Sequence, residues 1–411
     1  MNEHIRIIHT ADLHIGTQNY GKIDPSTGLH TRLLDFLKTF DELVDQAIDS
    51  DTDIVLICGD VFKSREPDVT QQREFAKRIK RLSKEGIVVY IVIGNHDLHN
   101  ASGKATSVEI YDIVGLPGVF VKRRPGIDII NTKRGKIQLV ALPYVTSANL
   151  SCEGMSIEEL SLEMRKRLYE LTEQLSAGID MTLPAILASH YSVIGADSGS
   201  EKGIMLGREV TLPVSLFERS EYEYVAMGHI HKHQKLGNNP PVVYSGSLDR
   251  VDFSEENEDK GFVELFVKKG ETHYNFVKLN TRPFKTISVD ASSGDPFHKS
   301  IQAIDEINDL SRTIVKLKIS IEISSLHNLN ESELYKLLRQ NAFYVAGIEK
   351  TFSRDTSHLR HPGLTERMDA KQALSEYISK KDDYSKIKSD LLLENALILD
   401  EISMEAKNEA D

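Results

Sequence analysis

The chain has 411 residues, 40% of them hydrophobic and 27% charged, which is the composition of a soluble globular protein with two or three domains. It has no apolar run of the roughly 18 residues that a membrane helix needs, no recognisable signal peptide and only two cysteines, so we expect a cytoplasmic protein without a disulfide framework. Its formal net charge of −12 argues mildly against a nucleic-acid partner, but basic runs at 77–84, 122–124 and 133–136 leave that question open.

Short apolar runs and helical patterns alternate through the first half of the chain. The apolar runs, which are typical of buried strands, cover residues 5–9, 54–58, 87–93, 185–188 and 224–227. Apolar residues at helical spacing cover 33–48, 75–82 and 157–175, and the last two patterns stop near a glycine, as helix ends do. Strands that alternate with helices indicate parallel pairing with crossover helices.

Shorter strands separated only by turns are mixed into this pattern. Runs at 119–121, 127–130 and 137–142 lie close together, and the runs 261–267 and 273–279 flank a turn that indicates a hairpin. These pieces predict a second, partly antiparallel sheet. For residues 1–280 we therefore expect an α/β fold in which two packed sheets are covered by outer helices, an αββα sandwich.

The pattern changes near residue 281. A strand is expected at 286–289, a helix at 301–307, and a half-buried strand at 313–323, where apolar and polar residues alternate strictly. Asn330 and Glu333 fit a capping box at the start of a short helix, and a last strand follows at 343–348. This β-α-β-α-β order predicts a small separate α+β domain at 281–355.

The last residues, 356–411, have the pattern of a linker followed by amphipathic helix. HLRHPGLT at 358–365 has the composition of a linker, and apolar residues recur at helical spacing between 374 and 402. Such a segment is too short to bury much surface alone. We expect it to dock either on the rest of this chain or on another protein.

Residues that can bind metals follow each of the five buried strands of the first half. They are Asp12 and His14, Asp60, Asn95 with His96 and Asp97, His190, and finally His229 and His231. Any one of them alone is more often a helix cap or a hydrogen-bonded side chain, but five such strand ends are hard to obtain from capping. Ligands of open α/β sheets bind at the carboxyl ends of strands, so parallel neighbouring strands would place these groups along one rim.

The mixture of carboxylates and imidazoles suits a pair of Mn²⁺, Fe or Zn²⁺ ions. Asp60 is central enough in the set to bridge two ions. Paired ions clamp the attacking and leaving oxygens of a phosphoryl displacement and lower the pKa of a bound water. The phosphate-binding motif GxxxxGK[ST] is missing, so we do not expect the chain itself to bind ATP.

The motifs DLH, GDVF, GNHD, SH and GHIH occur in this order and resemble the five signatures of the calcineurin-like metallophosphoesterases. HTADLHIG at 9–16, GADSGSE at 195–201 and YSGSLDRVDFSE at 244–255 are more closely similar to the SbcD-type nuclease subunits of SbcCD DNA double-strand-break repair complexes. This resemblance extends over nearly the whole chain. It implies a metallophosphoesterase nuclease domain at 1–280, a DNA-capping domain at 281–355, and a linker and helical segment at 356–411 that binds an SbcC-type ATPase.

The resemblance also implies a role for each site residue. Asp12, His14, Asp60 and His231 would hold one metal, and Asp60, Asn95, His190 and His229 would hold the other. His96 matches the catalytic histidine and Asp97 the carboxylate that orients it, whereas His99 falls outside the motif and is expected to be a solvated loop residue. In one departure, Lys63 stands where several relatives have a histidine; it either contacts the phosphate backbone or is an ordinary surface lysine.

The function implied by the resemblance is that of a Mn²⁺-dependent DNA exonuclease and single-strand endonuclease that uses a metal-activated water. It would process double-strand ends and hairpins with an SbcC-type ATPase in DNA repair, recombination and replication. It would act as a homodimer within a heterotetramer, in the cytoplasm at the nucleoid. Two alternatives stay open: a metallophosphatase or small-molecule phosphodiesterase with the same site, and a non-catalytic DNA-binding scaffold whose metals are structural.

Overall fold

The computed structural model describes residues 3–99, 103–146, 156–199 and 210–352. The first sheet has the strand order β14-β13-β1-β2-β3-β4. Strands β1 to β4 are parallel, whereas β13 is antiparallel to β1 and to β14. The bounds are β1 (Ile5–Thr10), β2 (Ile54–Cys58), β3 (Val88–Val92), β4 (Val119–Lys122), β13 (Gly261–Lys268) and β14 (Glu271–Lys278).

The second sheet has the strand order β11-β12-β10-β7-β6-β5. Its four central strands are parallel, and β5 and β11 are antiparallel at the edges. The bounds are β5 (Gly126–Thr132), β6 (Gly135–Leu142), β7 (Ala185–His190), β10 (Tyr224–Gly228), β11 (Gln234–Lys235) and β12 (Val242–Tyr244). The prediction of a second, partly antiparallel sheet is confirmed, but β4 and the β13–β14 hairpin, which the sequence pattern grouped with it, extend the first sheet instead.

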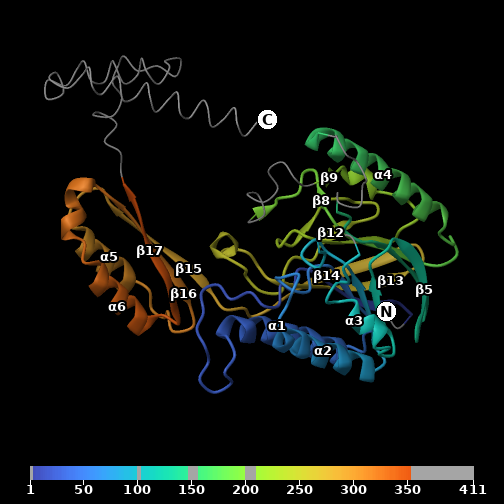
Figure 1. Cartoon of the computed structure of the whole chain (residues 1–411), viewed down its shortest axis with the longest axis horizontal. Coiled ribbons are helices and arrows are strands. Elements are labelled where there is room, and N and C mark those ends of the chain that lie inside the picture. The colour runs from blue at the N-terminus through green and yellow to red at the C-terminus, as the bar shows by residue number, and fades with distance from the viewer. Residues whose placement is uncertain (1–2, 100–102, 147–155, 200–209, 353–411) are drawn as a thin grey trace, which may run out of the picture. The chain divides into compact units, whose positions relative to one another are not determined.

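Helices cover the outer faces of the two sheets (Figure 1), which confirms the predicted αββα layers. α1 (Thr31–Asp49) and α2 (Val69–Lys84) pack on the first sheet, and α4 (Ile157–Ala177) packs on the second. Burial of both faces explains why strand β2 is a continuous apolar run in the sequence. Leu56 packs between the sheets, whereas Val55 and Ile57 pack beneath the helices. A strand buried on both faces has no polar side to alternate with.

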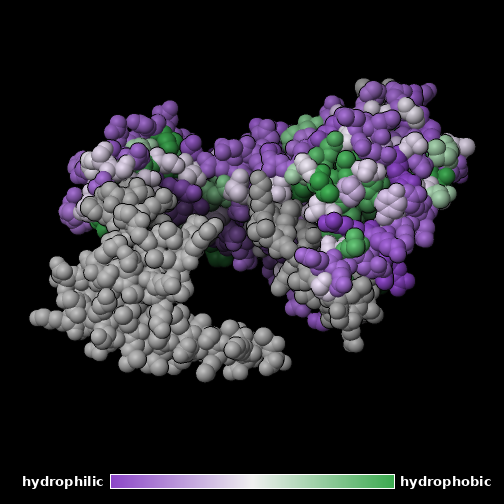
Figure 2. All heavy atoms as spheres, turned by 90° about the horizontal axis from the view of Figure 1, so that it is seen from above, coloured by the Kyte–Doolittle hydropathy of each residue, from purple (hydrophilic) through white to green (hydrophobic). Residues whose placement is uncertain are grey.

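Short elements connect these layers. They are α3 (Ile110–Ile113), the two-stranded sheet of β8 (Ser192–Val193) and β9 (Thr211–Leu212), and the 3-10 turns η3 (Val214–Leu216) and η4 (Phe253–Glu255). On the face seen in Figure 2, hydrophilic side chains predominate and apolar ones form small areas between them, as is usual for a globular surface. Among the described residues, no helix combines the length and the apolar character that crossing a bilayer requires.

A third sheet follows, with the strand order β15-β16-β17. The β-α-β-α-β order predicted for this region is confirmed, with a 3-10 turn added after the second strand. The elements are β15 (Phe284–Ala291), α5 (Pro296–Asp305), β16 (Ile314–Ile321), η5 (Ile323–Asn328), α6 (Glu331–Asn341) and β17 (Tyr344–Phe352). In β16 the apolar residues are buried, and Lys316 and Lys318 lie on the other face.

The chain divides into two compact units. One unit comprises Met1–Ser288, Ile301–Lys318 and Glu331–Glu349, and the other comprises Val289–Ser300, Ile319–Asn330 and Lys350–Asp411. The predicted linker and helical segment at 356–411 lie outside the described residues. The predicted domain functions therefore stay predictions.

Candidate metal centre

The predicted metal-binding residues are drawn together from both sheets, and not along the rim of one sheet. Asp12, Asp60 and Asn95 follow strands of the first sheet, and His190 and His229 lie at the ends of strands of the second. The carboxyl ends of the two sheets meet closely: His190 Nδ1 donates a hydrogen bond of 2.6 Å to the carbonyl oxygen of Cys58. A Cβ atom added to Gly228 would lie 1.9 Å from that oxygen, so this approach requires glycine.

Four of the predicted ligands have left-handed backbone conformations, which are uncommon for residues other than glycine. The φ angles are 53° for Asp12, 40° for His14, 54° for Asp60 and 95° for His229. Two parallel backbone hydrogen bonds hold the first loops: Asp12 N–H donates to Gly59 O, and His14 N–H donates to Asp60 O, both at 3.1 Å. Strain of this kind persists where the surrounding structure fixes it and clusters at functional sites.

One half of the centre contains Asp12, His14 and His231. Their ligand atoms lie within 4.8 Å of one another, and all three residues are buried. Nε2 of His14 lies 2.9 Å from Nε2 of His231, so the two rings direct the same kind of donor atom into one small space. Asp60 Oδ2 is 3.8 Å from His14 Nε2, which places a carboxylate at the same point.

Glu255 orients His231, and the sequence analysis did not assign it a role. His231 Nδ1 donates a hydrogen bond of 2.8 Å to Glu255 Oε1, which leaves Nε2 as the ring atom directed at the centre. Lys260 Nζ, also buried, lies 2.8 Å from the other oxygen of Glu255. Burial opposes ionisation of Glu255, but His231 and Lys260 outweigh it and hold the pKa of the carboxyl well below its usual range. Carboxylates that fix ligand histidines in this way are typical of metal sites.

A signal for Glu255 was present in the sequence, because it is the last residue of the motif YSGSLDRVDFSE at 244–255. Only the tertiary contact with His231, 24 residues away, reveals what it does.

The other half of the centre contains Asp60, Asn95, His190 and His229. His190 Nε2 lies 2.9 Å from Asn95 Oδ1 and 3.4 Å from Asp60 Oδ1, and His229 Nδ1 lies 3.2 Å from the same amide oxygen. Asp60 also belongs to groups of ligand atoms with Asp12 and with His14, so it occupies the middle position that a bridging ligand needs. The carboxylates of Asp12 and Asp60 are almost fully buried, and buried anions need cations close by; this donor set fits a pair of divalent ions.

The electrostatics of His190 follow from the same crowding of carboxylates. Burial disfavours the charged imidazolium, but the Asp60 carboxylate outweighs this effect and raises the pKa of His190 to about 10. Burial would likewise raise the pKa of Asp60, yet His190 holds it well below the usual value. Asp60 therefore keeps its anionic form, which is the form that binds cations, whereas burial raises the pKa of Asp12.

His96 and Asp97 lie beside the centre, but their contact differs from the expected one. His96 Nδ1 donates to the carbonyl oxygen of Lys63 at 3.1 Å. The Asp97 carboxylate instead accepts three backbone N–H groups, from Gly94 at 2.9 Å, Asp60 at 2.9 Å and Val61 at 3.1 Å. Asp97 thus fixes the loops that carry the ligands, and the Lys63 carbonyl takes the orienting role that we expected of Asp97.

Residues 5–233 match the family model described as calcineurin-like phosphoesterase, and this match covers more than half of the chain. The chain belongs to the calcineurin-like phosphoesterase family. As a member of this family it is a metal-dependent phosphoesterase, and the His and Asp clusters described above provide the site for the two metals that are typical of the family.

Three solved structures that are similar to this phosphoesterase have low sequence identity to it. A dimetal phosphatase from Danio rerio is 10% identical, with a TM-score of 0.38, over 66% of this chain and 95% of that one. A protein from Thermus thermophilus is 13% identical, with a TM-score of 0.34, over 66% and 99%. A protein-tyrosine phosphatase from a psychrophilic Shewanella species is 13% identical, with a TM-score of 0.26, over 66% and 80%.

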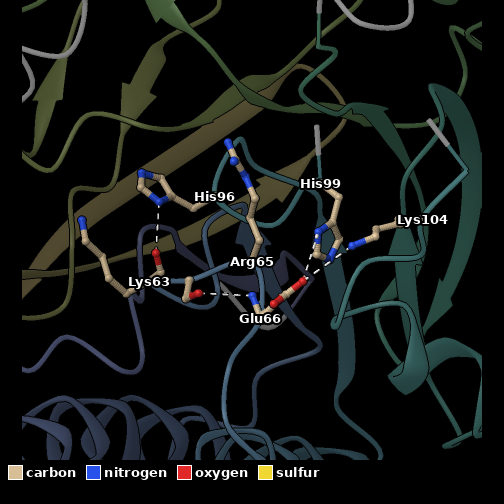
Figure 3. A pocket seen from close by; sticks show the side chains of 7 residues that line it. Lys63, Arg65, Glu66, His96, His99 and Lys104 are labelled. Carbon is tan, nitrogen blue, oxygen red and sulfur yellow. Dashed lines mark hydrogen bonds and ion pairs between the residues drawn. The ribbon is translucent and has the colours of Figure 1, made fainter. Parts of the chain in front are cut away.

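A basic pocket of about 650 Å³ opens beside His96 of the phosphoesterase site (Figure 3). It is lined by Lys63, Ser64, Arg65, Glu66, His96, His99 and Lys104. Glu66 is the one acidic residue among them, and its carboxylate lies 3.7 Å from Lys104 Nζ and 4.0 Å from His99 Nδ1. His99, expected to be a solvated loop residue, therefore lines a pocket, with 15% of its side chain exposed.

Proposed function

We propose that this phosphoesterase is a Mn²⁺-dependent DNA nuclease of the SbcD type, with exonuclease and single-strand endonuclease activity, that acts with an SbcC-type ATPase. The basic pocket next to His96 carries the proposal. A monoester or a small diester needs charge neutralisation only at its reacting phosphate. A polynucleotide brings further phosphates to either side, and these favour Lys and Arg at the rim of the site.

The positions of the cationic side chains support a substrate with more than one phosphate. Lys63 is half-buried and its carbonyl contacts the His96 ring, so its side chain begins next to the reaction centre. Arg65 is exposed, and Figure 3 shows its side chain extending away from Glu66. Neither cation is paired with Glu66, which contacts Lys104 instead. Their charges therefore remain available for the phosphates adjacent to the scissile one.

In the proposed reaction, a water attacks the phosphorus atom, a new P–O bond forms, and the bond to the 3′ oxygen breaks. When bound, two divalent ions supply an acidified water and neutralise charge on the phosphate. The hydrogen bond from His96 Nδ1 to the Lys63 carbonyl leaves Nε2 as the atom that can donate a proton to the departing 3′ oxygen. Burial of the ligand cluster, with Asp12 and His14 at most 1% exposed, strengthens each electrostatic contact there.

The partner proposal concerns residues 366–411, which lie outside the described part of the chain. Their amphipathic pattern is typical of helices that lie in the groove of another protein. We assign them the docking of the SbcC-type ATPase, in a complex that contains two copies of each protein and binds DNA ends through the region 281–355.

The experiment that tests the nuclease proposal is cleavage of end-labelled duplex, hairpin and single-stranded DNA by the purified full-length chain with Mn²⁺, alone and with an SbcC-type ATPase. Wild type should cut DNA, and His96→Asn should lose at least about 100-fold in rate while keeping the wild-type metal content. Absence of DNA cleavage in both conditions, together with rapid turnover of a small phosphodiester, would establish the alternative of a small-molecule phosphodiesterase.

A paired substitution tests the basic pocket. Changing Lys63 and Arg65 to Glu should slow DNA cleavage and make it more sensitive to salt, while hydrolysis of a chromogenic small phosphodiester changes little. Lys136→Glu is the matched control, because this exposed lysine lies at the amino end of β6, away from the carboxyl edge of the sheet. Equal salt dependence of DNA cleavage in the double variant and the control would exclude the pocket as a DNA-binding site.

A further inference from the structure

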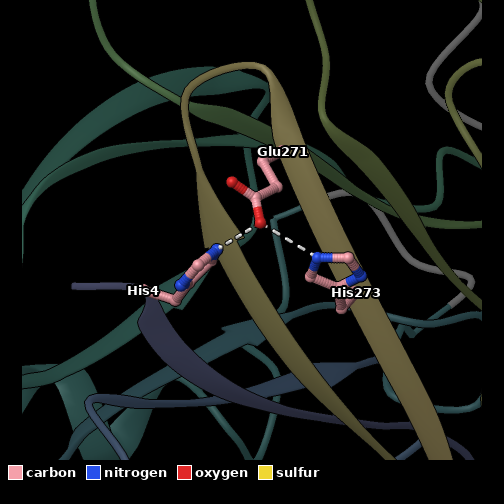
Figure 4. A group of neighbouring side chains, drawn as sticks. All are labelled: His4, Glu271 and His273. Carbon is pink, nitrogen blue, oxygen red and sulfur yellow. Dashed lines mark hydrogen bonds and ion pairs between the residues drawn. The ribbon is translucent and has the colours of Figure 1, made fainter. Parts of the chain in front are cut away.

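Three potential metal ligands lie close together in the first sheet, at the end of β1 that is away from the phosphoesterase site. They are His4, which directly precedes β1, and Glu271 and His273 in β14 (Figure 4). Their ligand atoms lie within 4.8 Å of one another. The site residues follow the other end of β1, and six strand residues span about 20 Å, so this group is separate from the catalytic ligands.

Strand register places the three side chains on one face of the sheet. Arg6 pairs with Phe266, which pairs with His273, and Lys268 pairs with Glu271. Alternate residues of a strand point to the same side, so Glu271 and His273 share a face, and His4 lies two residues before Arg6. In Figure 4 the rings of His4 and His273 both approach the Glu271 carboxylate, from opposite sides.

His4 is the residue that ordinary hydrogen bonding does not explain. Its side chain is 7% exposed, and neither ring nitrogen has a hydrogen-bond partner among the described residues. Nε2 nevertheless lies 3.2 Å from Glu271 Oε1, without the angles of a hydrogen bond. A buried polar group without a partner is destabilising, so a ligand at this position would remove a penalty.

The distances from the Glu271 carboxylate to the two imidazoles are close to those between neighbouring ligands of zinc. Glu271 Oε1 is 3.2 Å from His4 Nε2 and 3.0 Å from His273 Nε2. Two ligands of a tetrahedral Zn²⁺ with bonds of about 2.0–2.1 Å are roughly 3.3 Å apart. The second oxygen of Glu271 is held by Lys268 Nζ at 2.7 Å, which leaves Oε1 directed between the two imidazoles.

We propose that His4, Glu271 and His273 bind a Zn²⁺ ion, with water as the fourth ligand. The ion joins the segment before β1 to the β13–β14 hairpin. Its ligands His4 and Glu271 are 267 residues apart in the sequence. Its role is to stabilise this edge of the sheet, independently of the phosphoesterase reaction.

The test counts bound zinc in tag-free, full-length protein. Metal-stripped protein is dialysed against micromolar Zn²⁺ and the zinc content per chain is measured by mass spectrometry. Wild type should hold one zinc more than His273→Gln and one more than Glu271→Gln, and zinc should raise its melting temperature further than theirs. His298→Gln is the matched control, because this exposed histidine also pairs with a carboxylate, Asp295 at 3.0 Å, without a second histidine.

Two further measurements make the outcome decisive. Phosphodiester hydrolysis by His273→Gln should equal that of wild type, which shows that the catalytic metals and the fold are intact. In crystals of the wild type, an anomalous difference map at the zinc edge should contain a peak about 2.1 Å from both imidazole nitrogens. Equal zinc content in wild type and in both variants, or no such peak, would overturn the proposal.

Discussion

The contact between Glu255 and His231 leads to a prediction that separates orientation of a ligand from its identity. Replacing Glu255 with Gln keeps the size of the side chain and removes its charge. His231 Nδ1 then loses a charge-assisted hydrogen bond of 2.8 Å in a site where Glu255 is fully buried. The ring becomes free to rotate or to place its proton on Nε2, the atom that faces His14 at 2.9 Å. Both changes weaken metal binding, although no ligand has been removed.

The magnitude follows from the strength of such bonds. Hydrogen bonds to charged groups contribute about 1.5–3 kcal/mol, and about 1.4 kcal/mol corresponds to a tenfold change in an equilibrium constant. We therefore expect Glu255→Gln to raise the Mn²⁺ concentration needed for half-maximal activity by about 10- to 100-fold, as changes behind metal-bound histidines do. Activity at saturating Mn²⁺ should recover most of the wild-type rate, because the ligands remain.

The assay is hydrolysis of a chromogenic phosphodiester over a range of Mn²⁺ concentrations. Glu258→Gln is the matched control: Glu258 also pairs with Lys260, at 2.8 Å, whereas Glu255 is the carboxylate that accepts from His231 Nδ1. The control should keep the wild-type Mn²⁺ dependence. If Glu255→Gln and Glu258→Gln respond to Mn²⁺ alike while both remain folded, the assignment of Glu255 as the residue that orients His231 would be refuted.

Three other predictions address the packing of the sheets, a buried carboxyl group and the end of the chain. Gly228→Ala should destabilise the metal-free protein by about 2–3 kcal/mol in urea unfolding, because the new Cβ would meet the Cys58 carbonyl oxygen. Gly126→Ala is the control and should change stability little, because Gly126 has open space around it. Equal effects of the two substitutions would contradict the close approach of the sheets. Burial raises the pKa of Asp249 from 3.8 to about 6, against the opposing effect of Arg32, so the stabilising contribution of this group is complete below pH 3.8 and is lost as the pH rises through 6. Relative to wild type, Asp249→Asn should therefore gain about 2 kcal/mol between pH 4 and pH 6.5, and a difference that stays constant over this range in chemical denaturation would argue against the raised pKa. Deleting 366–411 should abolish capture of the SbcC-type ATPase in a pull-down assay but leave the metal content unchanged, and retained capture would contradict the assignment of this segment.

The sequence by itself determined the local elements and the chemistry at their ends. Apolar runs buried on both faces identified the central strands, since parallel strands between two helical layers leave no polar face. The polar residues that follow these strands identified the ligand set, because ligands of α/β sheets gather at carboxyl ends. Asp12, Asp60, Asn95 and His190 could be named in this way without knowing which strands are neighbours.

Only the tertiary structure decided how these strand ends meet. Periodicity describes one strand at a time, whereas the pairing of strands is set by the apolar layer between the sheets, where Leu56 and Ile186 pack in one cluster. That packing places β7 and β10 opposite β2 instead of beside it, so the centre joins two sheets. It also decided the contacts that no local pattern encodes: Glu255 behind His231, Asp97 on the backbone of the ligand loops, and His4 beside a hairpin that is far away in the sequence. The sequence shows which residue types are present, but it does not show which residues become partners. A hydrogen bond or a shared metal depends on distances between atoms that only the folded chain defines.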